Sequence, residues 1–434
     1  MAEPWRNWTG DQRCEPNRVE RPRTRAGLAD SVNRAVEEGR RIRVAGSGHS
    51  FSDIALTDGV QLRLGGLSSI LDVDRGAGLV KVEAGIVLGE LSRRLDAIGF
   101  ALENLGDIDR QTLAGAISTG THGTGARFRN LSAQVEAVEM VTANGRWREV
   151  SLADDRTAFR AARVGLGALG VVYALTLRVV PAFTIRRVDR PVPLTEVLAA
   201  LDELADANDH FEFYVFPHTE LALVRESERT CAPPEPRGPA LEYLLEVAVE
   251  NWAVEALALA GRAVPAAIPF LARAVAGNLL GRSVKVDGSH RVFASDRRVR
   301  FTEMEYAIPR AGAAGAVRRV LELASGEALD VSFPIEVRFV APDDALLSPA
   351  HERETCYVAV HMYRGMPWED YFRGVEAIMD EHEGRPHWGK RHFQTAATLA
   401  PRYPRWEEFQ RVRRRLDPGG TFANACTDRV LGPS

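Results

Sequence analysis

Short apolar runs separated by glycines fill the first 180 residues, a pattern typical of a mixed α+β domain. Apolar residues recur at helical spacing between Thr24, a residue type that caps helices, and Gly39. The segment "RIRVA" that follows predicts a strand leading to Gly46. A second amphipathic helix is predicted from residue 88 until Gly99 stops the pattern. Helices and short strands therefore alternate in this part of the chain.

Two hairpins and one further strand are also predicted before residue 181. Residues 71–85 alternate apolar and polar positions around a glycine turn. Residues 135–151 do the same around Asn144-Gly145, which predicts a primed two-residue turn. Residues 171–180 predict a strand, which Pro181 follows.

After residue 181, strand-like segments are separated by helical patterns. The strand-like segments are "HFEFYVFP", "RVRFTEMEYAI", "VSFPIEVRFV" and "TCYVAVHMY", and the helical patterns cover 194–206, 311–325 and 368–381. This order predicts an antiparallel sheet with helices on one face. The expected fold class is α+β, with a first unit over 1–180, a second over 181–410 and a C-terminal segment over 411–434.

Composition excludes several classes of protein. A length of 434 residues allows two or three domains, and a net charge of −4 predicts no nucleic-acid partner. The cysteines Cys14, Cys231, Cys356 and Cys426 show no C-x-x-C spacing, so neither a zinc site nor a redox dithiol is expected. Residues 1–16 lack a secretory pattern, and we therefore expect a cytoplasmic location.

One apolar stretch leaves two alternatives open. Residues 252–281 are rich in Ala and Leu, but Arg262, Arg273, Pro265 and Pro269 interrupt them, so they cannot form a spanning helix. One interpretation is a pair of short buried helices. The other is a surface that contacts a membrane or a partner.

Two motif-like segments do not fit the sites they suggest. "GLGALG" at 165–170 has the dinucleotide spacing, but a helical pattern precedes it and a strand follows it, which is the reverse of the required order. "GRPHWGKR" at 384–391 has P-loop spacing, but Arg391 occupies the position of the magnesium-binding hydroxyl residue. We therefore predict neither a Rossmann site nor a nucleoside-triphosphatase.

Two glycine-rich loops carry the strongest chemical signal. "GSGHSF" at 46–51 and "LAGAISTGTHGTG" at 113–125 lie in one predicted domain, and each contains a histidine. Glycines let a backbone approach a ligand closely, and N–H groups in such loops can hold a phosphate. Together the loops predict that a bulky dinucleotide is gripped from two sides.

The motifs "AGSGHSF", "STGTHGTG" and "GLGALGVV" together resemble the FAD-binding domain of vanillyl-alcohol-oxidase-type flavoproteins, also called the PCMH type. "HWGK" and "LDPGGTFAN" are similar to segments of the sugar-lactone and alditol oxidoreductases within that group. The resemblance implies a two-subdomain FAD-binding domain over 1–180 and a substrate (cap) domain over 181–410. It also implies that 411–434 packs back near the flavin.

The resemblance also implies which residues bind FAD. His49 occupies the position at which many members bond the flavin covalently, whereas other members have an apolar residue there and bind FAD without a bond. The implied FAD-binding residues are Ala45, Gly46, Ser47, Gly48, His49, Ser50, Thr112, Gly115, Thr119, Gly120, Thr121, His122, Gly123, Gly170 and Val171.

A substrate pocket is predicted on the strand "VSFPIEVRFV". Strand alternation places Glu336 and Arg338 on one face, where an ordinary surface ion pair would be one reading. The resemblance instead implies that this pair positions substrate over the flavin. It also places Lys390 beside the pocket, and the pattern "CYVAVHMY" directs His361 to the same side. His361 or an adjacent carboxylate is the candidate base.

The resemblance implies oxidation of an aldono-1,4-lactone, such as L-gulono-, L-galactono- or D-arabinono-1,4-lactone, to an ascorbate-type product. The hydride would pass to flavin N5 and then to O₂, a cytochrome or a quinone. The alternative is oxidation of a polyol such as xylitol, as in alditol oxidase. Contact with a membrane acceptor would fit the stretch at 252–281.

Overall fold

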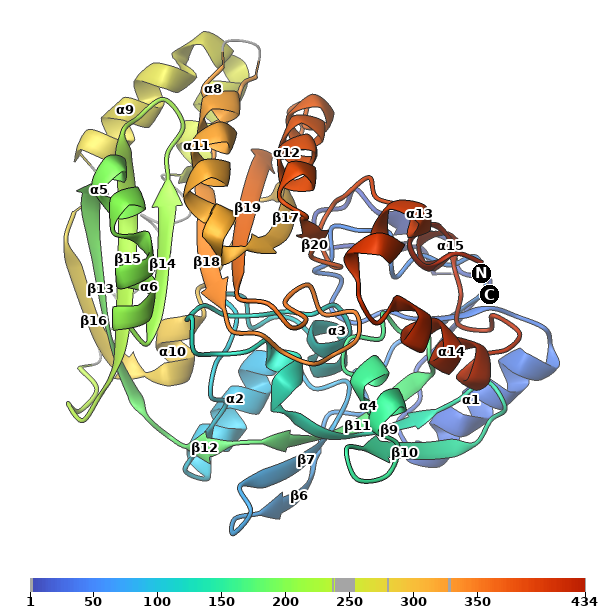
Figure 1. The fold of residues 1–434 in the computed structure, drawn as a ribbon. Coiled ribbons are helices and arrows are strands. Elements are labelled where there is room, and N and C mark those ends of the chain that lie inside the picture. Colours follow the sequence, from blue (N-terminus) through green and yellow to red (C-terminus); the bar gives the residue numbers. More distant parts are fainter. Residues whose placement is uncertain (1–2, 236–237, 239–253, 279–280, 327–328, 434) are drawn as a thin grey trace.

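The computed structural model describes residues 3–235, 238, 254–278, 281–326 and 329–433. Three sheets of three or more strands organise these residues (Figure 1). The smallest is parallel, in the order β3 (Arg18–Glu20), β5 (Val60–Leu62) and β4 (Ile42–Val44). Helix α1 (Arg25–Glu37) belongs to this part, and Thr24 accepts the backbone N–H of Gly27 as its cap. The predicted helix and the strand that follows it are both confirmed.

A five-stranded antiparallel sheet forms the second part of the N-terminal half. Its order is β10 (Trp147–Ser151), β9 (Val135–Val141), β11 (Val171–Arg178), β7 (Leu79–Glu83) and β6 (Ile70–Asp74). The helices of this part are α2 (Leu88–Ala97), α3 (Leu113–Ser118) and α4 (Arg156–Ala162). Both predicted hairpins are present in this sheet.

The predicted primed turn of the β9–β10 hairpin is wrong. The N–H of Thr142 donates to the carbonyl of Arg146 at 3.1 Å, so three residues, not two, form the loop. A type I′ turn needs positive φ at both central residues, but among 144 and 145 only Gly145 has one, at +71°. The Asn144 side chain instead accepts the N–H of Arg146 at 3.1 Å and the hydroxyl of Thr142 at 2.7 Å, which stabilises the longer loop.

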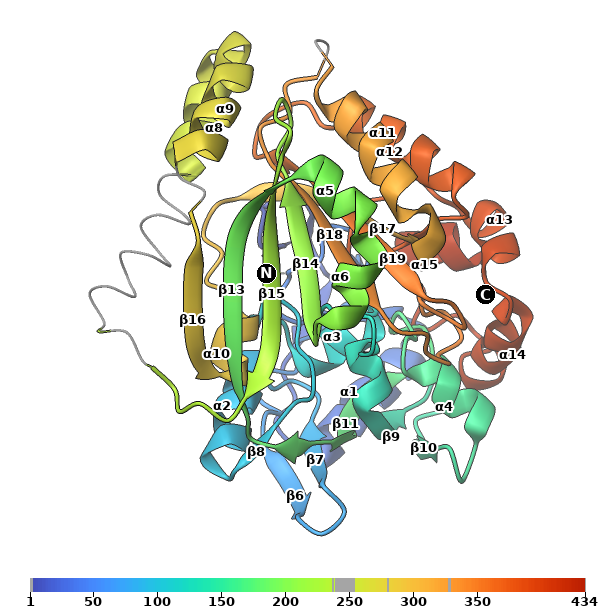
Figure 2. The same ribbon diagram turned by 60° about the vertical axis from the view of Figure 1, so that its left-hand side comes forward.

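The C-terminal half is built on an eight-stranded antiparallel sheet, as predicted (Figure 2). Its order is β16 (Ser283–Gly288), β13 (Thr184–Pro193), β15 (Leu221–Thr230), β14 (His210–Val215), β18 (Ile335–Val340), β19 (Thr355–Tyr363), β17 (Phe301–Pro309) and β20 (Arg385–Pro386). Helices α5 (Leu194–Ala199), α6 (Leu201–Ala207), α11 (Ala313–Ala324) and α12 (Glu369–Glu381) cover one face. The expected helix over 194–206 is two helices that meet at Ala200.

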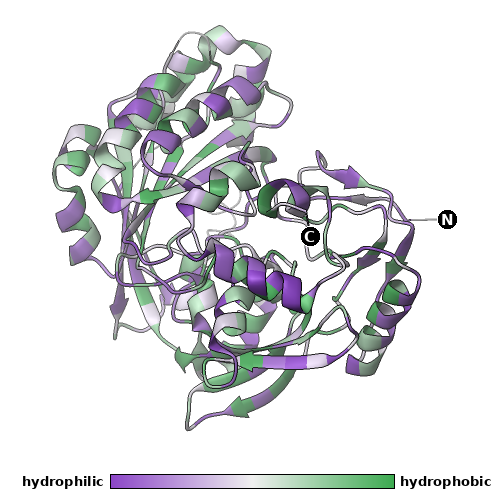
Figure 3. Cartoon of the chain, turned by 45° about the vertical axis from the view of Figure 1, so that its right-hand side comes forward, coloured by the Kyte–Doolittle hydropathy of each residue, from purple (hydrophilic) through white to green (hydrophobic). Residues whose placement is uncertain are grey.

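Strand alternation gives this sheet two chemically different faces. Phe211, Phe213 and Val337 pack with the covering helices in one hydrophobic cluster. The residues between them, such as Glu212 and Glu336, therefore lie on the opposite face, which is also buried. Figure 3 shows apolar and polar colours on the strands as well as on the helices. The large sheet therefore carries buried polar side chains on the face opposite the helices, where they can contact a ligand.

The stretch at 252–281 contains two helices, α8 (Val254–Ala263) and α9 (Ile268–Asn278), at one end of the large sheet (Figures 1 and 2). A helix pair was one of the two expectations, but its burial was predicted wrongly: Phe270 is 72% exposed and Val264 56%. Residues 252, 253, 279 and 280 lie outside the described residues. Within the part that the structure describes, no helix is long and apolar enough to cross a membrane.

Residues after 405 form α14 (Trp406–Leu416) and α15 (Ala425–Leu431) and contact the N-terminal half. The N–H of Ile42 donates to the carbonyl of Thr421 at 2.7 Å, and Asn424 Nδ2 donates to the carbonyl of Leu56 at 2.8 Å. The remaining short elements are β1 (Trp5–Arg6), β2 (Arg13–Cys14), β8 (Phe100–Ala101), β12 (Val180–Pro181), α10 (Ser289–Phe293) and α13 (Ala396–Leu399).

Candidate active site

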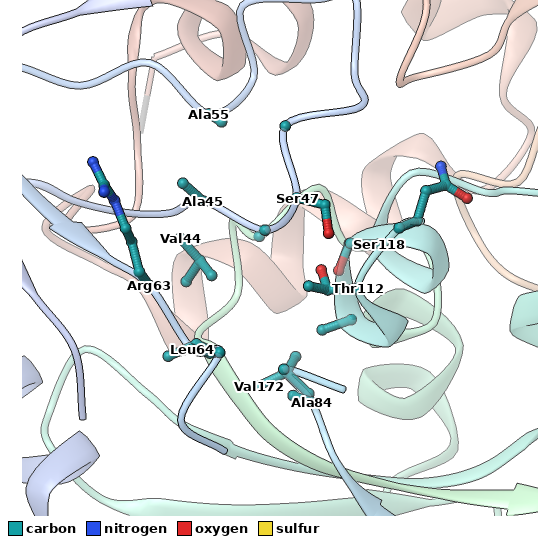
Figure 4. Close-up of a pocket in the computed structure, with 18 of the residues that line it drawn as sticks. Val44, Ala45, Ser47, Ala55, Arg63, Leu64, Ala84, Thr112, Ser118 and Val172 are labelled. Atoms are coloured by element: carbon teal, nitrogen blue, oxygen red, sulfur yellow. The ribbon is translucent and has the colours of Figure 1, made fainter. Parts of the chain in front are cut away.

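A cavity of about 480 Å³ lies between the two glycine-rich loops (Figure 4). Ten of the residues predicted to bind the cofactor line it: Ala45, Gly46, Ser47, Gly48, His49, Ser50, Thr112, Gly115, Thr119 and Gly170. Sequence reasoning missed other lining residues, among them Arg43, Leu64, Gly85 and Gln111. Arg43 lies on β4, Leu64 and Gly85 follow β5 and β7, and Gln111 lies just before α3.

The first loop presents free backbone donors to this cavity. Among the described residues, no acceptor is bound to the N–H groups of 46–50, five in succession. Such a run of N–H groups forms a site for an anion, and a pyrophosphate would satisfy it. A Cβ atom on Gly46 would lie 2.3 Å from Thr112 Oγ1, so only glycine lets the two loops approach this closely. The donor set and the cavity fit FAD.

His49 lies in this loop with its ring stacked on Trp8, the ring centroids being 5.5 Å apart. Burial lowers the pKa of His49 to about 4, and the positive charges of Lys390, Arg300 and Arg110 contribute. The imidazole is therefore neutral at neutral pH. A neutral imidazole has a free nitrogen lone pair, which a covalent bond to a cofactor requires.

Five of the predicted cofactor residues lie outside the cavity lining. Val171 points into a hydrophobic cluster, while its neighbours Gly170 and Val172 line the cavity. The remaining four are Gly120, Thr121, His122 and Gly123. The last of these lines a separate small cavity.

His122 forms a buried pair with Glu305, with 3.2 Å between Nε2 and Oε1. Its Nδ1 lies 2.8 Å from the carbonyl of Gly123 and must carry a proton, because a carbonyl only accepts. The contact with Glu305 therefore contains an additional proton. Burial opposes ionisation of Glu305, yet His122 and His387 hold its pKa well below the usual range.

His122, Glu305 and His387 offer atoms close enough to hold a metal ion. However, the Nδ1 of His387 accepts the N–H of Gly389 at 3.0 Å, so its proton is on Nε2. A ring nitrogen that carries a proton has no lone pair for a metal. The hydrogen bonds therefore favour a proton-sharing cluster over a set of metal ligands.

The predicted pair Glu336 and Arg338 lies on the buried polar face of the large sheet, in contact with each other. Arg338 Nε also donates to Glu212 Oε2 at 2.8 Å, and Tyr214 OH lies 2.9 Å from Glu336 Oε1. Asp107 reaches Arg338 from a loop of the N-terminal half, at 3.5 Å. An exposed surface ion pair is thereby excluded.

Burial raises the pKa of Glu336 to about 7; Arg338 opposes this shift, while Asp107 and Glu212 add to it. Arg338 and Arg297 hold the pKa of Asp107 below its usual range despite burial. Glu336 is therefore the carboxylate of this group that exchanges a proton near neutral pH. Such a group suits general-base catalysis.

Lys390 and His361 converge on Glu303 of β17. Lys390 Nζ lies 2.6 Å from one oxygen of Glu303, and His361 Nε2 lies 3.7 Å from the other. Burial favours the neutral amine, but Glu303 and Glu305 raise the pKa of Lys390, so it is a cation. The N–H of Phe51 donates to the carbonyl of Gly389 at 2.7 Å, which brings Lys390 to the first glycine loop.

Sequence reasoning missed Asp107, Glu212, Tyr214 and Glu303 as members of this site. A signal was present in the strands, because "HFEFYVF" and "FTEMEYAI" place carboxylates at alternate positions between large apolar residues. A carboxylate in such a position lies on one face of a buried strand and needs a partner.

Comparisons with known proteins agree with this geometry. The model of the D-arabinono-1,4-lactone oxidase family matches residues 175–430, and that of an FAD binding domain matches residues 16–151. The chain belongs to the D-arabinono-1,4-lactone oxidase family. It is therefore an FAD-dependent oxidoreductase of the sugar-lactone oxidase and dehydrogenase group, as the resemblance implied.

Members of this group align over nearly the whole chain. L-gulono-1,4-lactone dehydrogenase of Mycobacterium tuberculosis is 49% identical over 100% of both chains. L-gulonolactone oxidase of Bos taurus is 34% identical over 98% of both chains. Alditol oxidase of a Streptomyces species is 33% identical over 98% of both chains.

The solved structure of a solvent-stable cholesterol oxidase superimposes with a TM-score of 0.81 at 17% identity, covering 100% of this chain and 98% of that one. This match shows the fold alone. Together with the match to the FAD binding domain, it confirms the predicted α+β fold of the vanillyl-alcohol-oxidase type.

Proposed function

We propose that this protein oxidises an aldono-1,4-lactone, such as L-gulono-, L-galactono- or D-arabinono-1,4-lactone, to an ascorbate-type enediol lactone. The observation that carries the proposal is Glu336, a buried carboxylate with a pKa near 7 held between Arg338 and Tyr214. The 49% identical relative that is named for L-gulono-1,4-lactone supports the substrate class.

Each residue of the site has a role in this proposal. When bound, FAD supplies the acceptor for the hydride that leaves the carbinol carbon. Glu336 accepts the proton of the same hydroxyl group, and Arg338 orients the substrate oxygens. Lys390 supplies a fixed positive charge beside the cofactor cavity, and His361 accepts a substrate hydrogen bond through its unprotonated Nε2. Residues 46–50, Thr112, Gly115, Thr119 and Gly170 would hold the cofactor.

The experiment that tests the substrate class compares L-gulono-1,4-lactone with xylitol. Purified protein loaded with FAD is mixed with each compound without oxygen, and bleaching of the flavin absorbance is followed. We expect the lactone to reduce the flavin faster at equal concentration. Faster reduction by xylitol would support an alditol oxidase, the alternative that the 33% identical Streptomyces relative favours. Reduction by neither compound would contradict both functions.

We further propose that FAD is bonded to His49. The low pKa of His49 and its position in the cavity wall support the bond. Precipitation of the holoprotein with acid should leave the flavin in the pellet, and His49→Ala should release it to the supernatant. His392→Ala is the control, because this histidine lines no part of the cavity. Flavin released from the unmodified protein would contradict the covalent bond while leaving the flavoenzyme intact.

The sequence does not distinguish O₂, a cytochrome and a quinone as the compound that reoxidises the flavin. We propose an acceptor other than O₂, because the 49% identical relative is named a dehydrogenase. Reoxidation of the reduced protein should be slow in air-saturated buffer and fast with cytochrome c or a soluble quinone. Rapid reoxidation by air would show an oxidase.

The proposed organisation keeps the predicted units: FAD-binding over 1–180, substrate-binding over 181–410, and a C-terminal segment over 411–434. Contacts of Thr421 and Asn424 with β4 and the loop after it support the last assignment. We propose a cytoplasmic location, supported by four unpaired cysteines. The exposed apolar residues of α8 and α9 support peripheral contact with a membrane.

A further inference from the structure

Three side chains form a hydrogen-bonded string across strands β18 and β14. Tyr214 OH lies 2.9 Å from Glu336 Oε1 and 3.1 Å from Glu212 Oε1. Strand pairing fixes this arrangement, because Tyr214 stands opposite Glu336 in the register and Glu212 stands opposite Arg338. All three side chains are buried.

Two hydrogen bonds at Tyr214 require one proton more than two ionised carboxylates and one phenol carry. The Tyr214 hydroxyl has one hydrogen and can donate to only one carboxylate. The other contact is a hydrogen bond only if its carboxyl group carries a proton. That proton can reside on Glu336 with Tyr214 donating to Glu212, or on Glu212 with Tyr214 donating to Glu336. Both arrangements use the same atoms.

The far end of the string meets a separate polar cavity. Glu212 lines a space of about 30 Å³ together with Arg187, His210, Arg225 and Ser227. Arg338, Asp107 and the apolar residues Leu105, Val292 and Phe293 line it as well, whereas Glu336 and Tyr214 do not. This volume holds about two water molecules, and the polar lining offers them partners. No residue lines both this space and the large cavity between the glycine loops.

The neighbouring charges keep the two ends of the string different. Arg225 NH1 donates to Glu212 Oε1 at 3.0 Å, and Arg338 Nε donates to its other oxygen. Burial opposes ionisation of Glu212, but Arg338 and Arg225 lower its pKa. Burial raises the pKa of Tyr214 well above its ordinary value, so the phenol stays neutral. Glu212 is therefore ionised more readily than Glu336.

We propose that Tyr214 and Glu212 form a proton exit for Glu336, leading from the substrate to the polar cavity at His210 and Ser227. The inference rests on the proposed role of Glu336 as the base. Once Glu336 has taken the hydroxyl proton, its O–H bond breaks as a new one forms on Tyr214. The original Tyr214 O–H bond breaks as one forms on Glu212, and water in the cavity removes that proton. The net result is the transfer of one proton from Glu336 to water, and no electron is transferred.

The exit is tested by timing proton release against flavin reduction. Holoprotein is mixed with L-gulono-1,4-lactone without oxygen at pH 8 in weak buffer containing a pH-indicator dye. In the unmodified protein, release should coincide with bleaching of the flavin. Tyr214→Phe also removes a hydrogen bond from Glu336, so the rate of bleaching can change; the expected result is that release lags behind bleaching in the same sample by at least about tenfold. Release that remains simultaneous with bleaching, or equal slowing of both, would overturn the proposal.

Two further variants keep the test decisive. Glu212→Gln preserves the shape of the side chain and should delay release in the same way, even if Tyr214→Phe folds poorly. Tyr371→Phe is the matched control, because this buried tyrosine lies on α12, within the helix-side cluster, and its hydroxyl has no partner among the described residues. It should leave both signals unchanged.

A measurement without substrate tests the resting proton. At pH 6 the infrared spectrum of the unmodified protein minus that of Glu336→Gln should contain the carbonyl band of a protonated buried carboxyl group, and the spectrum of Glu212→Gln should retain that band. The contribution of Asp343, whose pKa burial raises to about 6, cancels in this difference. A difference spectrum without the band would overturn the proton count. If the lactone fails to bleach the flavin of the unmodified protein, the proposed function fails instead, and the infrared result still decides the proton count.

Discussion

At the residue scale, carboxylates that share one arginine titrate differently. Glu336, Glu212 and Asp107 all contact Arg338, yet burial raises the pKa of Glu336 while the arginines lower those of the other two. Arg225 supports Glu212 and Arg297 supports Asp107, so Glu336 is the carboxylate left with Arg338 alone as its cationic contact among the described ion pairs. Glu336 therefore has the highest pKa of the three carboxylates, because additional arginines contact Glu212 and Asp107 but not Glu336.

This difference predicts a pH dependence. Glu336 can accept a proton only when ionised, so the rate of flavin reduction by the lactone should rise as pH increases through about 7 and then level off. Glu336→Gln should lower that rate by about 10² to 10⁴-fold and remove the dependence. Glu376→Gln, a change at a carboxylate on α12 that accepts the Tyr306 hydroxyl, is the control and should keep the profile. A flat profile in the unmodified protein would exclude Glu336 as the base.

At the element scale, strand alternation was readable from the sequence but strand pairing was not. The pattern "VSFPIEVRFV" places Glu336 and Arg338 on one face, as the structure confirms. The pattern does not show that Tyr214, 122 residues earlier, stands opposite Glu336. Register between distant strands depends on the packing of the whole sheet, so the sequence indicates single strands and misses the site they share.

Helices α8 and α9 are the elements that we expect to contact a membrane. Phe270 is 72% exposed, so Phe270→Ser should leave folding unchanged. It should weaken binding to liposomes, measured by co-sedimentation, by at least about tenfold, since burial of a phenylalanine contributes about 1.5–3 kcal/mol. Leu152→Ser removes an exposed apolar side chain from the β10 side of the molecule and should have no effect. Equal recovery of the Phe270 variant and the unmodified protein would exclude this contact.

At the scale of the whole molecule, the C-terminal segment braces the loop beside the cofactor cavity. Asn424 Nδ2 donates to the carbonyls of Asp53, Ile54 and Leu56, and Arg43 in the cavity wall donates to the carbonyl of Phe422. The sequence predicted that 411–434 returns to the flavin only through the family resemblance. Composition and periodicity do not indicate these contacts, because the acceptors are backbone carbonyls, which every residue has.

Asn424→Ala should therefore affect both stability and cofactor binding. Loss of the side chain leaves the carbonyl of Leu56 without this donor and removes the cap of α15, where Asn424 Oδ1 accepts the N–H of Thr427. This should lower the free energy of unfolding by about 1–3 kcal/mol and reduce the ratio of flavin to protein after purification. Thermal unfolding and the flavin-to-protein absorbance ratio measure the two effects. Asn208→Ala, which removes a hydrogen bond to Leu204 within 201–208, is the control and should retain full flavin content. Full flavin content in Asn424→Ala would show that the brace is not needed to hold FAD.

The contact between Asn424 and the loop at 53–56 also has a consequence for biosynthesis. The two partners are about 370 residues apart, so the ribosome makes the loop long before it makes the brace. A nascent chain that already contains both glycine loops still lacks one support of the cavity. We expect the cofactor to be retained only after the distal segment has emerged, so that yellow colour in a preparation reports chains translated to at least that point.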